Sequence, residues 1–418
     1  MKKAISDQFQ PGSGPSGLLY LLLFIIWPFL AFIIALFNYT RKEARTVVFF
    51  FLVYYGLTFV YDNIYVDASR YVEDLVRTAA LPFSDFGKIV AGLYSDTTVD
   101  IVEPFVTFVV SRFTTSGGIL YAVWAAIFAF FYLKSINLLF DRYQLSPGAN
   151  AFIFMAFFIL IQPITKVGGI RMPIATWIFF LGAYHVVLNR DPKYLLLALS
   201  STLVHWSFLT VNVLLLIYFF AGNRNLIYFP IVIVSFIIPQ VAAPYFETAA
   251  RSLGGAFMQR YEGYSSEGYI LSNMYQMEDA PWFVQLSGKF IFYYLIAAIL
   301  IIFFFTGRYE KERPERNLFS FLLLLLAFVN FGSIIPTFGG RFEIIFYLFA
   351  TLYIFIHFLK VEGNNLRLIT WLGLLPMFLY VAVLFRIDSV SVSAFLFTPG
   401  LGVPLLAPAV SLADVLFL

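Results

Sequence analysis

Long uninterrupted runs of apolar residues recur along the whole chain and constrain its fold more than any other feature. Many of them approach the ~20 residues that a helix needs to cross the hydrocarbon core of a bilayer. Only 12% of the 418 residues are charged and 61% are hydrophobic, whereas soluble domains carry about a quarter charged residues. Outer-membrane barrels are excluded as well, because their strands appear as short segments of alternating hydrophobicity. The sequence therefore predicts an all-α, polytopic membrane protein, since a span in lipid must bond its own backbone amides.

The apolar runs predict about 11–13 transmembrane helices, some of them short or broken, in a single transmembrane domain that covers residues 1–418. They cover residues 18–37, 46–60, 117–138, 151–164, 172–188, 194–220, 226–241, 283–305, 318–335, 342–358 and 368–384. The first run lacks a cleavage-site pattern, so we expect a retained span rather than a secretory signal. A proline-interrupted tail, residues 391–418, follows the last run, and whether it spans is left open.

Lysine and arginine gather in four short connections and set the expected orientation. They are Arg41, Lys42 and Arg45; Arg190 and Lys193; Arg308, Lys311, Arg313 and Arg316; and Lys360 and Arg367. By the positive-inside rule these connections lie in the cytoplasm. The two long connections, residues 62–103 and 244–284, are then outer loops. Both are acidic, with eight carboxylates against three basic residues in the first and five against two in the second.

An odd number of apolar runs lies between the basic groups at Arg190 and Arg308, so one run must cross twice or not at all. Residues 194–220 are the candidate for this irregular run. At ~1.5 Å per residue they are too long for one upright span and too short for two. We expect two short helices that bend near residues 202–207, with His205 at the bend on the outer side. A single, strongly tilted helix is the alternative. Short or broken helices of this kind tend to line a cavity.

Five basic residues lie near predicted outer helix ends, where membrane insertion disfavours them. They are Arg112, Lys166, Arg171, Arg341 and Arg386. Gly168-Gly169 precedes Arg171 and Gly339-Gly340 precedes Arg341, and each segment is expected to open a helix. Helix N-termini attract anions, glycine lets a ligand approach the backbone, and a guanidinium can hold phosphate bidentately. Two such ends facing one cavity would suit a diphosphate, although each arginine could instead snorkel to headgroup phosphates.

Three further side chains are candidates for acid–base chemistry. His205 lies among apolar residues, where an ionisable group is costly and often functional; a hydrogen-bonded core histidine is the alternative. Glu103 precedes Pro104 at the start of an apolar stretch, which also fits an ordinary helix-start residue. Asp67 lies three residues before Arg70, which also fits a solvated surface pair.

The outer loops carry two weaker patterns. One apolar stripe in the first loop predicts an amphipathic helix on the membrane surface. The stripe consists of Val72, Leu75, Val76, Ala79 and Ala80. The second loop is rich in tyrosine, including Tyr264, and aromatic faces with hydroxyl groups suit sugar binding, although tyrosine is also common at membrane interfaces.

Several classes of function find no support in the sequence. Cysteine is absent and there are three histidines, which excludes disulfides and leaves little for a histidine-rich metal site. Nucleotide-binding and common hydrolase motifs are missing too. A formal net charge of +3 does not point to nucleic acid. We therefore expect no metal, no other cofactor and no nucleic-acid partner.

Three segments together resemble a known family. They are residues 168–209 (GGIRMPIATWIFFLGAYHVVLNRDPKYLLLALSSTLVHWSFL), DASRY at 67–71 and VEPFVTFVVSRF at 102–113. Their order is similar to that of the EpsG-type branch of bacterial Wzy-like polysaccharide polymerases: an Asp-containing first outer loop, a Glu-Pro start, an Arg before a small-residue helix, then a His. Arg341 is similar to the family's second arginine. The match is good over about residues 62–220, and the remainder agrees in hydropathy alone.

The resemblance implies a membrane glycosyltransferase with a GT-C-like fold. It would polymerise undecaprenyl-diphosphate-linked oligosaccharide repeat units into O-antigen, capsule or exopolysaccharide at the outer face of the bacterial cytoplasmic (inner) membrane. The expected partners are the lipid-linked donor and acceptor and membrane lipids, and the resemblance allows a chain-length regulator and a flippase.

The chemistry of such a transfer assigns expected roles. Negative charge develops on the leaving diphosphate, so Arg171 and Arg341 are expected to bind it, with Lys166 assisting. His205 is the first candidate for the base or for orienting the acceptor hydroxyl, and Asp67 or Glu103 is the alternative base. A weaker expectation gives glycan contacts to Arg70, Tyr71 and Tyr264.

Three alternatives remain open at this point. An O-antigen ligase-like enzyme would use a similar anion site but another acceptor. A membrane-bound O-acyltransferase would also need an intramembrane histidine, yet would take its acyl donor from the cytoplasm. A lipid-linked glycan flippase would need a continuous cationic cavity through the bilayer, whereas the anomalous basic residues gather on one predicted side.

Overall fold

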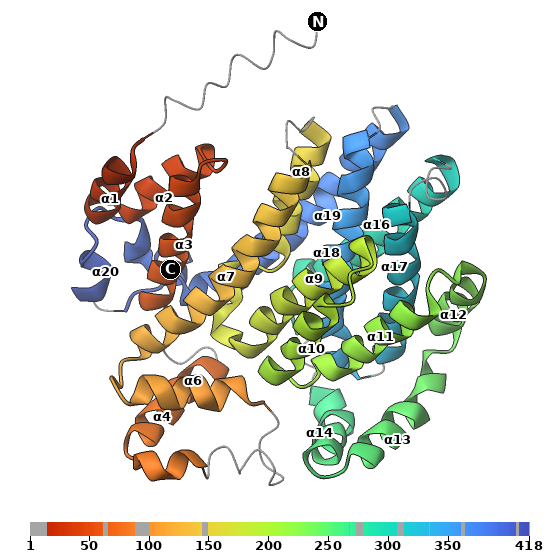
Figure 1. Cartoon of the computed structure of the whole chain (residues 1–418), viewed down its shortest axis with the longest axis horizontal. Coiled ribbons are helices and arrows are strands. Elements are labelled where there is room, and N and C mark those ends of the chain that lie inside the picture. The colour runs from red at the N-terminus through yellow and green to blue at the C-terminus, as the bar shows by residue number, and fades with distance from the viewer. Residues whose placement is uncertain are drawn as a thin grey trace, which may run out of the picture.

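The computed structural model describes residues 15–61, 66–87, 100–143, 149–266, 268–272, 279–306, 313–333, 335–360, 364–406 and 409–417. The regular elements in these ranges are helices, and one isolated bridge joins Ser393 to Ser411. Figure 1 shows them as a bundle of long, inclined helices with short helices at its margins. The expected all-α class is confirmed.

The helices follow one another in this order. The first part contains α1 (Gly17–Ile26), α2 (Pro28–Phe37), α3 (Lys42–Leu57), α4 (Val66–Ala79), the 3-10 turn η2 (Phe83–Asp85), α6 (Val102–Ser111) and α7 (Gly117–Tyr143). The middle contains α8 (Ala149–Ile161), η3 (Ile164–Gly169), α9 (Arg171–Asn189), α10 (Tyr194–Val204), α11 (Phe208–Ala221), α12 (Asn225–Ile237), η4 (Pro239–Ala242), α13 (Ala243–Leu253) and α14 (Gly255–Ser265). The last part contains α16 (Trp282–Thr306), α17 (Arg313–Gly332), α18 (Pro336–Lys360), α19 (Asn364–Asp388), η5 (Ser389–Ser391), η6 (Ala394–Phe397), α20 (Val403–Leu406) and α21 (Leu412–Leu416).

Seven of the described helices are long and apolar enough to cross a membrane. They are α7, α9, α16, α17, α18 and α19, together with residues 150–169 of α8 and η3. A bent pair, α12 with the η4–α13 segment, makes up to eight, and its two parts meet at 104°. The polytopic architecture is confirmed. The count is lower than the expected 11–13 because several apolar runs form helices of only 10–17 residues.

The first apolar run is one of these, because it forms two short helices where one continuous helix was expected. It breaks between α1 and α2 at Trp27, next to Pro28, which cannot donate a backbone hydrogen bond. The carbonyl groups at the end of α1 are instead satisfied by the C-terminal tail, since the N–H groups of Gly400 and Leu401 bond to Ile26 and Ile25 at 2.6 and 3.2 Å. The described part of the tail forms only short helices.

Helix α9 lies at the centre of the bundle, with 83% of its membrane-crossing window buried. Its Trp177 packs edge-on against Tyr132 and Phe158, with ring centroids 5.0 and 5.7 Å apart. Gly182 allows α10 to pack closely, because a Cβ at this position would lie 2.5 Å from the backbone nitrogen of Ala198. A central, tightly packed α9 fixes the position of its first residue, Arg171.

Residues 194–220 form the expected hairpin of two short helices. Helix α10 ends at Val204, α11 begins at Phe208, and His205 lies in the bend. The far end of α11 returns to the start of α10, since Arg190 Nη2 donates to the hydroxyl of Tyr218 at 3.1 Å. The predicted hairpin is confirmed and the single tilted helix is excluded, whereas the outer position of His205 stays a prediction.

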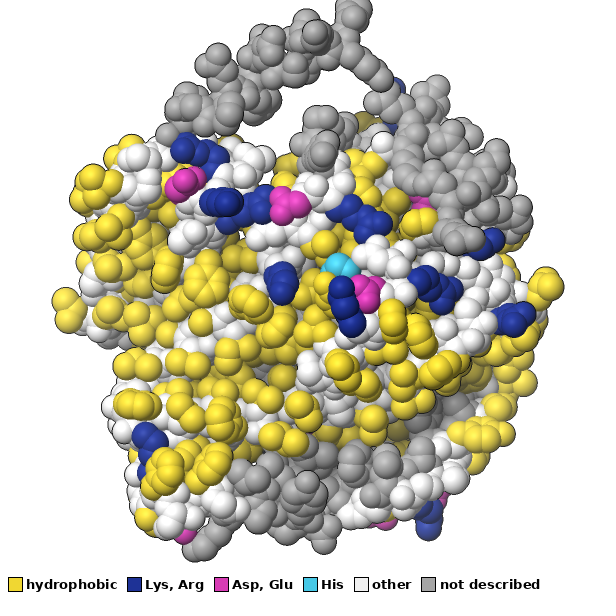
Figure 2. Space-filling model, viewed as in Figure 1, with side chains coloured by type: hydrophobic (Ala, Val, Ile, Leu, Met, Phe, Trp, Pro, Cys, Tyr) yellow, Lys and Arg dark blue, Asp and Glu magenta, His cyan; other side chains and the backbone are white. Residues whose placement is uncertain are grey.

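The short helices of the two acidic loops lie at one edge of the bundle. Figure 1 shows α4, α6, α13 and α14 along the lower edge, whereas the start of α8 and the end of α18 reach the upper edge. In the same view, Figure 2 shows basic side chains in a band above a broad apolar surface. Arg45, which bonds Asp141 at 2.6 Å, joins the start of α3 to the end of α7. The arrangement agrees with two polar ends, and their assignment to cytoplasm and outside stays a prediction.

Candidate functional site

Arg171 and Asp100 form a largely buried ion pair at the start of α9. The Nη1 atom of Arg171 lies 2.5 Å from Oδ2 of Asp100, and the exposed fractions of the two side chains are 20% and 4%. Nε of the same guanidinium donates to the hydroxyl of Tyr71 at 2.9 Å. Arg171 is the first residue of α9, as predicted. These two bonds orient the guanidinium from two other elements, α4 and the segment that leads into α6.

Asp100 also holds the bend between α10 and α11. Its second carboxylate oxygen, Oδ1, accepts a hydrogen bond from the backbone N–H of Trp206 at 2.8 Å. Next to it, the N–H of Ile101 donates to the carbonyl oxygen of Leu203 at 3.0 Å. One buried carboxylate therefore joins Arg171 to the residues on either side of His205.

His205 itself is buried, with 6% of its surface exposed. The backbone N–H of Ser207 donates to its Nδ1 at 3.3 Å, and Oγ of Ser207 lies 2.9 Å from the same nitrogen. Because Nδ1 accepts a hydrogen bond from the backbone, the neutral ring carries its proton on Nε2. The ring also contacts Phe208, which in turn contacts Phe342 with ring centroids 5.9 Å apart. His205 is thus connected by packing to the residue that follows Arg341.

The bend is recessed into the bundle. At ~1.5 Å per residue, α10 is about 16 Å long whereas α9 is about 28 Å, and the two helices pack closely along Gly182 and Ala198. Since α10 starts just after α9 ends, it turns back before it reaches the level of Arg171. The segment that carries Asp100 contacts the bend at this recessed position, so the site lies within the bundle.

Glu103 lies in the first turn of α6, near the ion pair. Its carboxylate accepts a hydrogen bond from Oγ1 of Thr107 at 3.0 Å. Burial raises the pKa of Glu103, and the Thr107 hydroxyl and the charge of Arg171 oppose this rise. Glu103 is therefore a carboxylate within electrostatic reach of Arg171 and with an increased affinity for a proton.

The residues of α4 divide into an exposed and a buried set. Asp67 and Arg70 form an ion pair of 3.0 Å in which both side chains are about half exposed, as the surface-pair alternative describes. Tyr71 is 2% exposed and bonds to Arg171. The contact of Tyr71 is therefore with the guanidinium, and its expected glycan contact stays a prediction.

The amphipathic helix is present as α4, but its buried stripe differs from the predicted one. Ala68, Tyr71 and Leu75 are buried, whereas Val76, which we expected on the apolar face, is 53% exposed. The buried face packs on α6, α7 and η3. The stripe shifts because α4 covers protein with its Ala68–Leu75 side, and its position at a membrane surface stays a prediction.

Arg341 does not open its helix, which corrects a second expectation. Helix α18 begins at Pro336, so Arg341 lies in its second turn, away from the unpaired N–H groups. Its guanidinium carbon lies 5.3 Å from the ring centroid of Tyr264, on α14. Arg341 and Tyr264, predicted separately as a phosphate ligand and a glycan contact, therefore contact each other.

Two of the four glycines serve packing. A Cβ at Gly168 would lie 2.8 Å from the ring of Phe59, and one at Gly339 would lie 2.8 Å from the Cα atom of Ser333. Protein atoms occupy the side-chain direction at these two positions, so a ligand cannot approach the backbone from that side. Gly340 differs, since a Cβ there would meet nothing within 4 Å.

The other basic residues at these helix ends bind within the protein. Lys166 pairs with the buried Asp388 at 2.8 Å and so joins η3 to the end of α19. Arg112 donates to the carbonyl oxygen of Leu81 at 2.6 Å and to that of Thr78, which fastens α6 to the end of α4. Arg386 lies over the ring of Phe417, 4.8 Å from its centroid. The expected contribution of Lys166 to an anion site would therefore compete with Asp388.

Sequence reasoning missed Asp100, whose carboxylate bonds both Arg171 and the bend at Trp206. The available signal was its position three residues before Glu103, in a segment that also carries Pro104. In the described ranges, no three His, Asp or Glu side chains gather closely enough to hold a metal ion. The charged groups that the site offers are a guanidinium and two carboxylates.

Comparison with protein families matches the chain to the EpsG family. The model of the EpsG family matches residues 83–399, which is most of the chain and includes Asp100, Glu103, Arg171, His205 and Arg341. Searches of curated proteins and of solved structures returned no match.

Proposed function

The chain belongs to the EpsG family, and from this premise we propose that it is a membrane glycosyltransferase that polymerises lipid-linked oligosaccharides. The substrates are undecaprenyl-diphosphate-linked repeat units, and the product is O-antigen, capsule or exopolysaccharide. The reaction takes place at the outer face of the bacterial inner membrane, in a fold related to the GT-C glycosyltransferases. Family membership supports a membrane protein of polysaccharide-polymerase type.

The observation that carries this proposal is the position of Arg171. Tyr71 and Asp100 fix the guanidinium at a helix start, and their bonds use two of its five N–H donors within the described part of the chain. The remaining donors and the adjacent helix N-terminus suit an anionic group. A cation held in advance by other side chains stabilises developing charge without having to reorganise.

The proposed reaction is a displacement at the anomeric carbon. The acceptor hydroxyl oxygen bonds to that carbon, the bond from carbon to the diphosphate oxygen breaks, and the diphosphate leaves with the electron pair. Arg171 stabilises the charge that develops on the leaving group more than it stabilises the bound substrate. The hydroxyl proton goes to the carboxylate of Glu103. A carboxylate with a raised pKa is a better proton acceptor near neutral pH than an ordinary one.

His205 then serves to orient the substrate. Because Nδ1 accepts from the backbone of Ser207, Nε2–H is a hydrogen-bond donor in the neutral ring. A donor can hold a sugar hydroxyl or a diphosphate oxygen, but it cannot take up the acceptor proton. We therefore assign the base to Glu103 rather than to His205. Arg341 is assigned to the second diphosphate or glycan contact, from its place beside Tyr264.

A reconstituted assay tests the proposal. Purified protein in vesicles receives purified lipid-linked repeat units, and products are separated on a gel. We expect a ladder of polymers from the wild type and none from Arg171→Lys, because lysine keeps the charge but loses the planar fork of donors. Arg77→Lys is the matched control, since Arg77 lies on α4 with its side chain 75% exposed.

The same variants separate the alternatives in cells. Loss of polymer with single repeat units still exported supports the polymerase. Accumulation of repeat units on the cytoplasmic side would support a flippase and contradict our proposal. Transfer of finished polymer to a different acceptor, without growth of the ladder, would indicate a ligase-like enzyme.

A further inference from the structure

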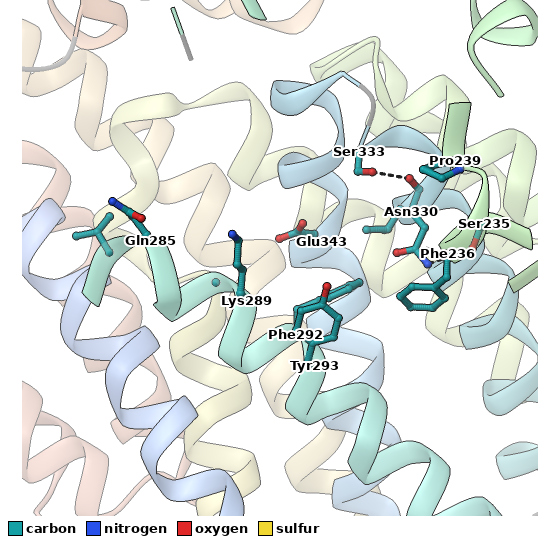
Figure 3. A pocket seen from close by; sticks show the side chains of 13 residues that line it. Ser235, Phe236, Pro239, Gln285, Lys289, Phe292, Tyr293, Asn330, Ser333 and Glu343 are labelled. Carbon is teal, nitrogen blue, oxygen red and sulfur yellow. Dashed lines mark hydrogen bonds between the residues drawn. The ribbon is translucent and has the colours of Figure 1, made fainter. Parts of the chain in front are cut away.

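A cavity of about 460 Å³ lies between α12, α16, α17 and α18, apart from the Arg171 cluster. Ligand-binding pockets in proteins have volumes of about 300–1,000 Å³. Its polar lining consists of Ser235, Gln285, Lys289, Tyr293, Asn330, Ser333 and Glu343. Figure 3 shows these side chains arranged around the cavity from several helices.

The polar groups suit an uncharged ligand with several hydroxyl groups. Lys289 supplies donors, Glu343 supplies acceptors, and the amide of Asn330 supplies both. The charges of Lys289 and Glu343 sum to zero, so the lining gives no net attraction to an anionic headgroup. Such a headgroup would also be repelled by the carboxylate of Glu343. An apolar chain would instead bury the amide of Asn330 and the carboxylate of Glu343, which is costly.

Aromatic side chains complete the lining. Phe236, Phe292 and Tyr293 lie beside the polar groups, and Phe236 and Tyr293 are 44% and 59% exposed. Amphipathic rings next to hydrogen-bonding groups match a sugar, which has apolar C–H faces and hydroxyl edges. Glu343 follows Arg341 by two residues on α18 and bonds the hydroxyl of Tyr347 at 2.9 Å. The cavity and Arg341 therefore share one helix.

We propose that this cavity binds a sugar ring of the lipid-linked oligosaccharide, at a distance from the diphosphate held by Arg171. This inference rests on the proposed function for the identity of the glycan. The class of ligand, an uncharged polyhydroxylated ring, is inferred from the lining of the cavity alone.

Gly288 offers a direct test, because it lines the cavity and a Cβ there would meet nothing within 4 Å. Gly288→Leu would place its Cβ in open space at the lining of the cavity and extend from there into the cavity. Leucine also favours the helix over glycine. Gly17→Leu is the matched control, since Gly17 is an exposed helical glycine with open space at the far N-terminal end of the described chain. Glu343→Gln is a second variant that keeps the volume of the side chain and removes its charge.

The experiment measures binding to full-length protein in nanodiscs with two probes. One is the labelled oligosaccharide released by mild acid from lipid-linked repeat units of the producing strain, and the other is undecaprenyl diphosphate. We expect Glu343→Gln to weaken oligosaccharide binding by about tenfold or more, the size of a lost hydrogen bond to a charged group. Gly288→Leu should weaken it at least as much, because leucine occupies space that the sugar ring needs. Undecaprenyl diphosphate should bind them as it binds the wild type.

Two results would overturn the inference: unchanged oligosaccharide binding in correctly folded Gly288→Leu, or an equal loss of undecaprenyl diphosphate binding, which would indicate a headgroup site. The polymerisation assay separates this failure from that of the proposed function. If the wild type makes no ladder but the cavity variants still bind the oligosaccharide more weakly, the proposed glycan site is supported and the proposed polymerase function is contradicted. If the wild type makes a ladder and Gly288→Leu polymerises with unchanged KM, the proposed polymerase function is supported and the proposed glycan site is contradicted.

Discussion

Asp100 and Trp206 are 106 positions apart in the chain, yet the carboxylate of one accepts the backbone N–H of the other at 2.8 Å. The same carboxylate bonds Arg171 at 2.5 Å. A single buried side chain thus sets the distance between the guanidinium and the bend that carries His205.

Asp100→Asn should reduce both stability and polymerisation. The amide keeps the shape of the side chain but removes the charge that faces Arg171, and we expect a loss of about 1–3 kcal/mol in the free energy of unfolding. Thermal unfolding in detergent measures it. Asp67→Asn, in an exposed pair, should change stability by no more than about 0.5 kcal/mol. Equal effects of the two substitutions would contradict the assigned importance of Asp100.

Tyr71→Phe should lower the rate without unfolding the protein. It removes the one hydroxyl that bonds Nε of Arg171 and leaves the buried ring in place. We expect a fall in kcat/KM of about tenfold, corresponding to roughly 1.4 kcal/mol. An unchanged rate would show that Asp100 alone orients the guanidinium.

The rate should depend on the protonation of Glu103. Its pKa is raised by burial, so the rise of the rate with pH should lie above the ordinary glutamate range of about 4.3. Glu103→Gln should remove this rise, the acidic limb of the pH profile, together with most of the activity. Thr107→Val should move the limb to higher pH, because the Thr107 hydroxyl stabilises the ionised form. A limb that Thr107→Val leaves in place would argue against Glu103 as the base.

Stability should show the opposite dependence on pH at this residue. The folded pKa of Glu103 is above the unfolded one, so its contribution to stability is fully present below about pH 4.3 and is lost as pH rises through the folded value. Comparison of unfolding in the wild type and in Glu103→Gln between pH 4 and 8 measures this contribution.

His205→Gln and His205→Leu distinguish a hydrogen-bond donor from a base. The amide of glutamine can replace the Nε2–H donor, whereas leucine cannot. We expect Gln to keep part of the polymerisation activity and Leu to lose it. If both lose all activity while remaining folded, with an acidic limb that persists in Glu103→Gln, His205 is the base instead.

Packing at Gly182 should control the geometry of the whole site. A side chain there would overlap the backbone of Ala198 and push α10 from α9. We expect Gly182→Val to destabilise the protein by about 1–3 kcal/mol and to abolish polymerisation by displacing the bend. Gly288→Ala has open space around it and should not destabilise the protein, because alanine favours the helix over glycine.

Much of the architecture was predictable because its causes are local. An apolar run of sufficient length specifies a helix in lipid whatever its neighbours are. The hairpin around His205 followed from the number of runs between two basic connections, and Arg171 at a helix start followed from the glycines before it. These inferences need only the length, polarity and order of segments.

The partners of the charged residues required the tertiary structure. Asp100 pairs with Arg171 and Lys166 with Asp388, and both pairs depend on paths that loops take between distant helices. The start of α18 at Pro336, and the use of Gly168 and Gly339 for close packing, are likewise set by what lies opposite them. The sequence by itself determined a polytopic helical protein and its unusual charges, whereas only tertiary packing decided which charges neutralise one another and which remain to bind a substrate.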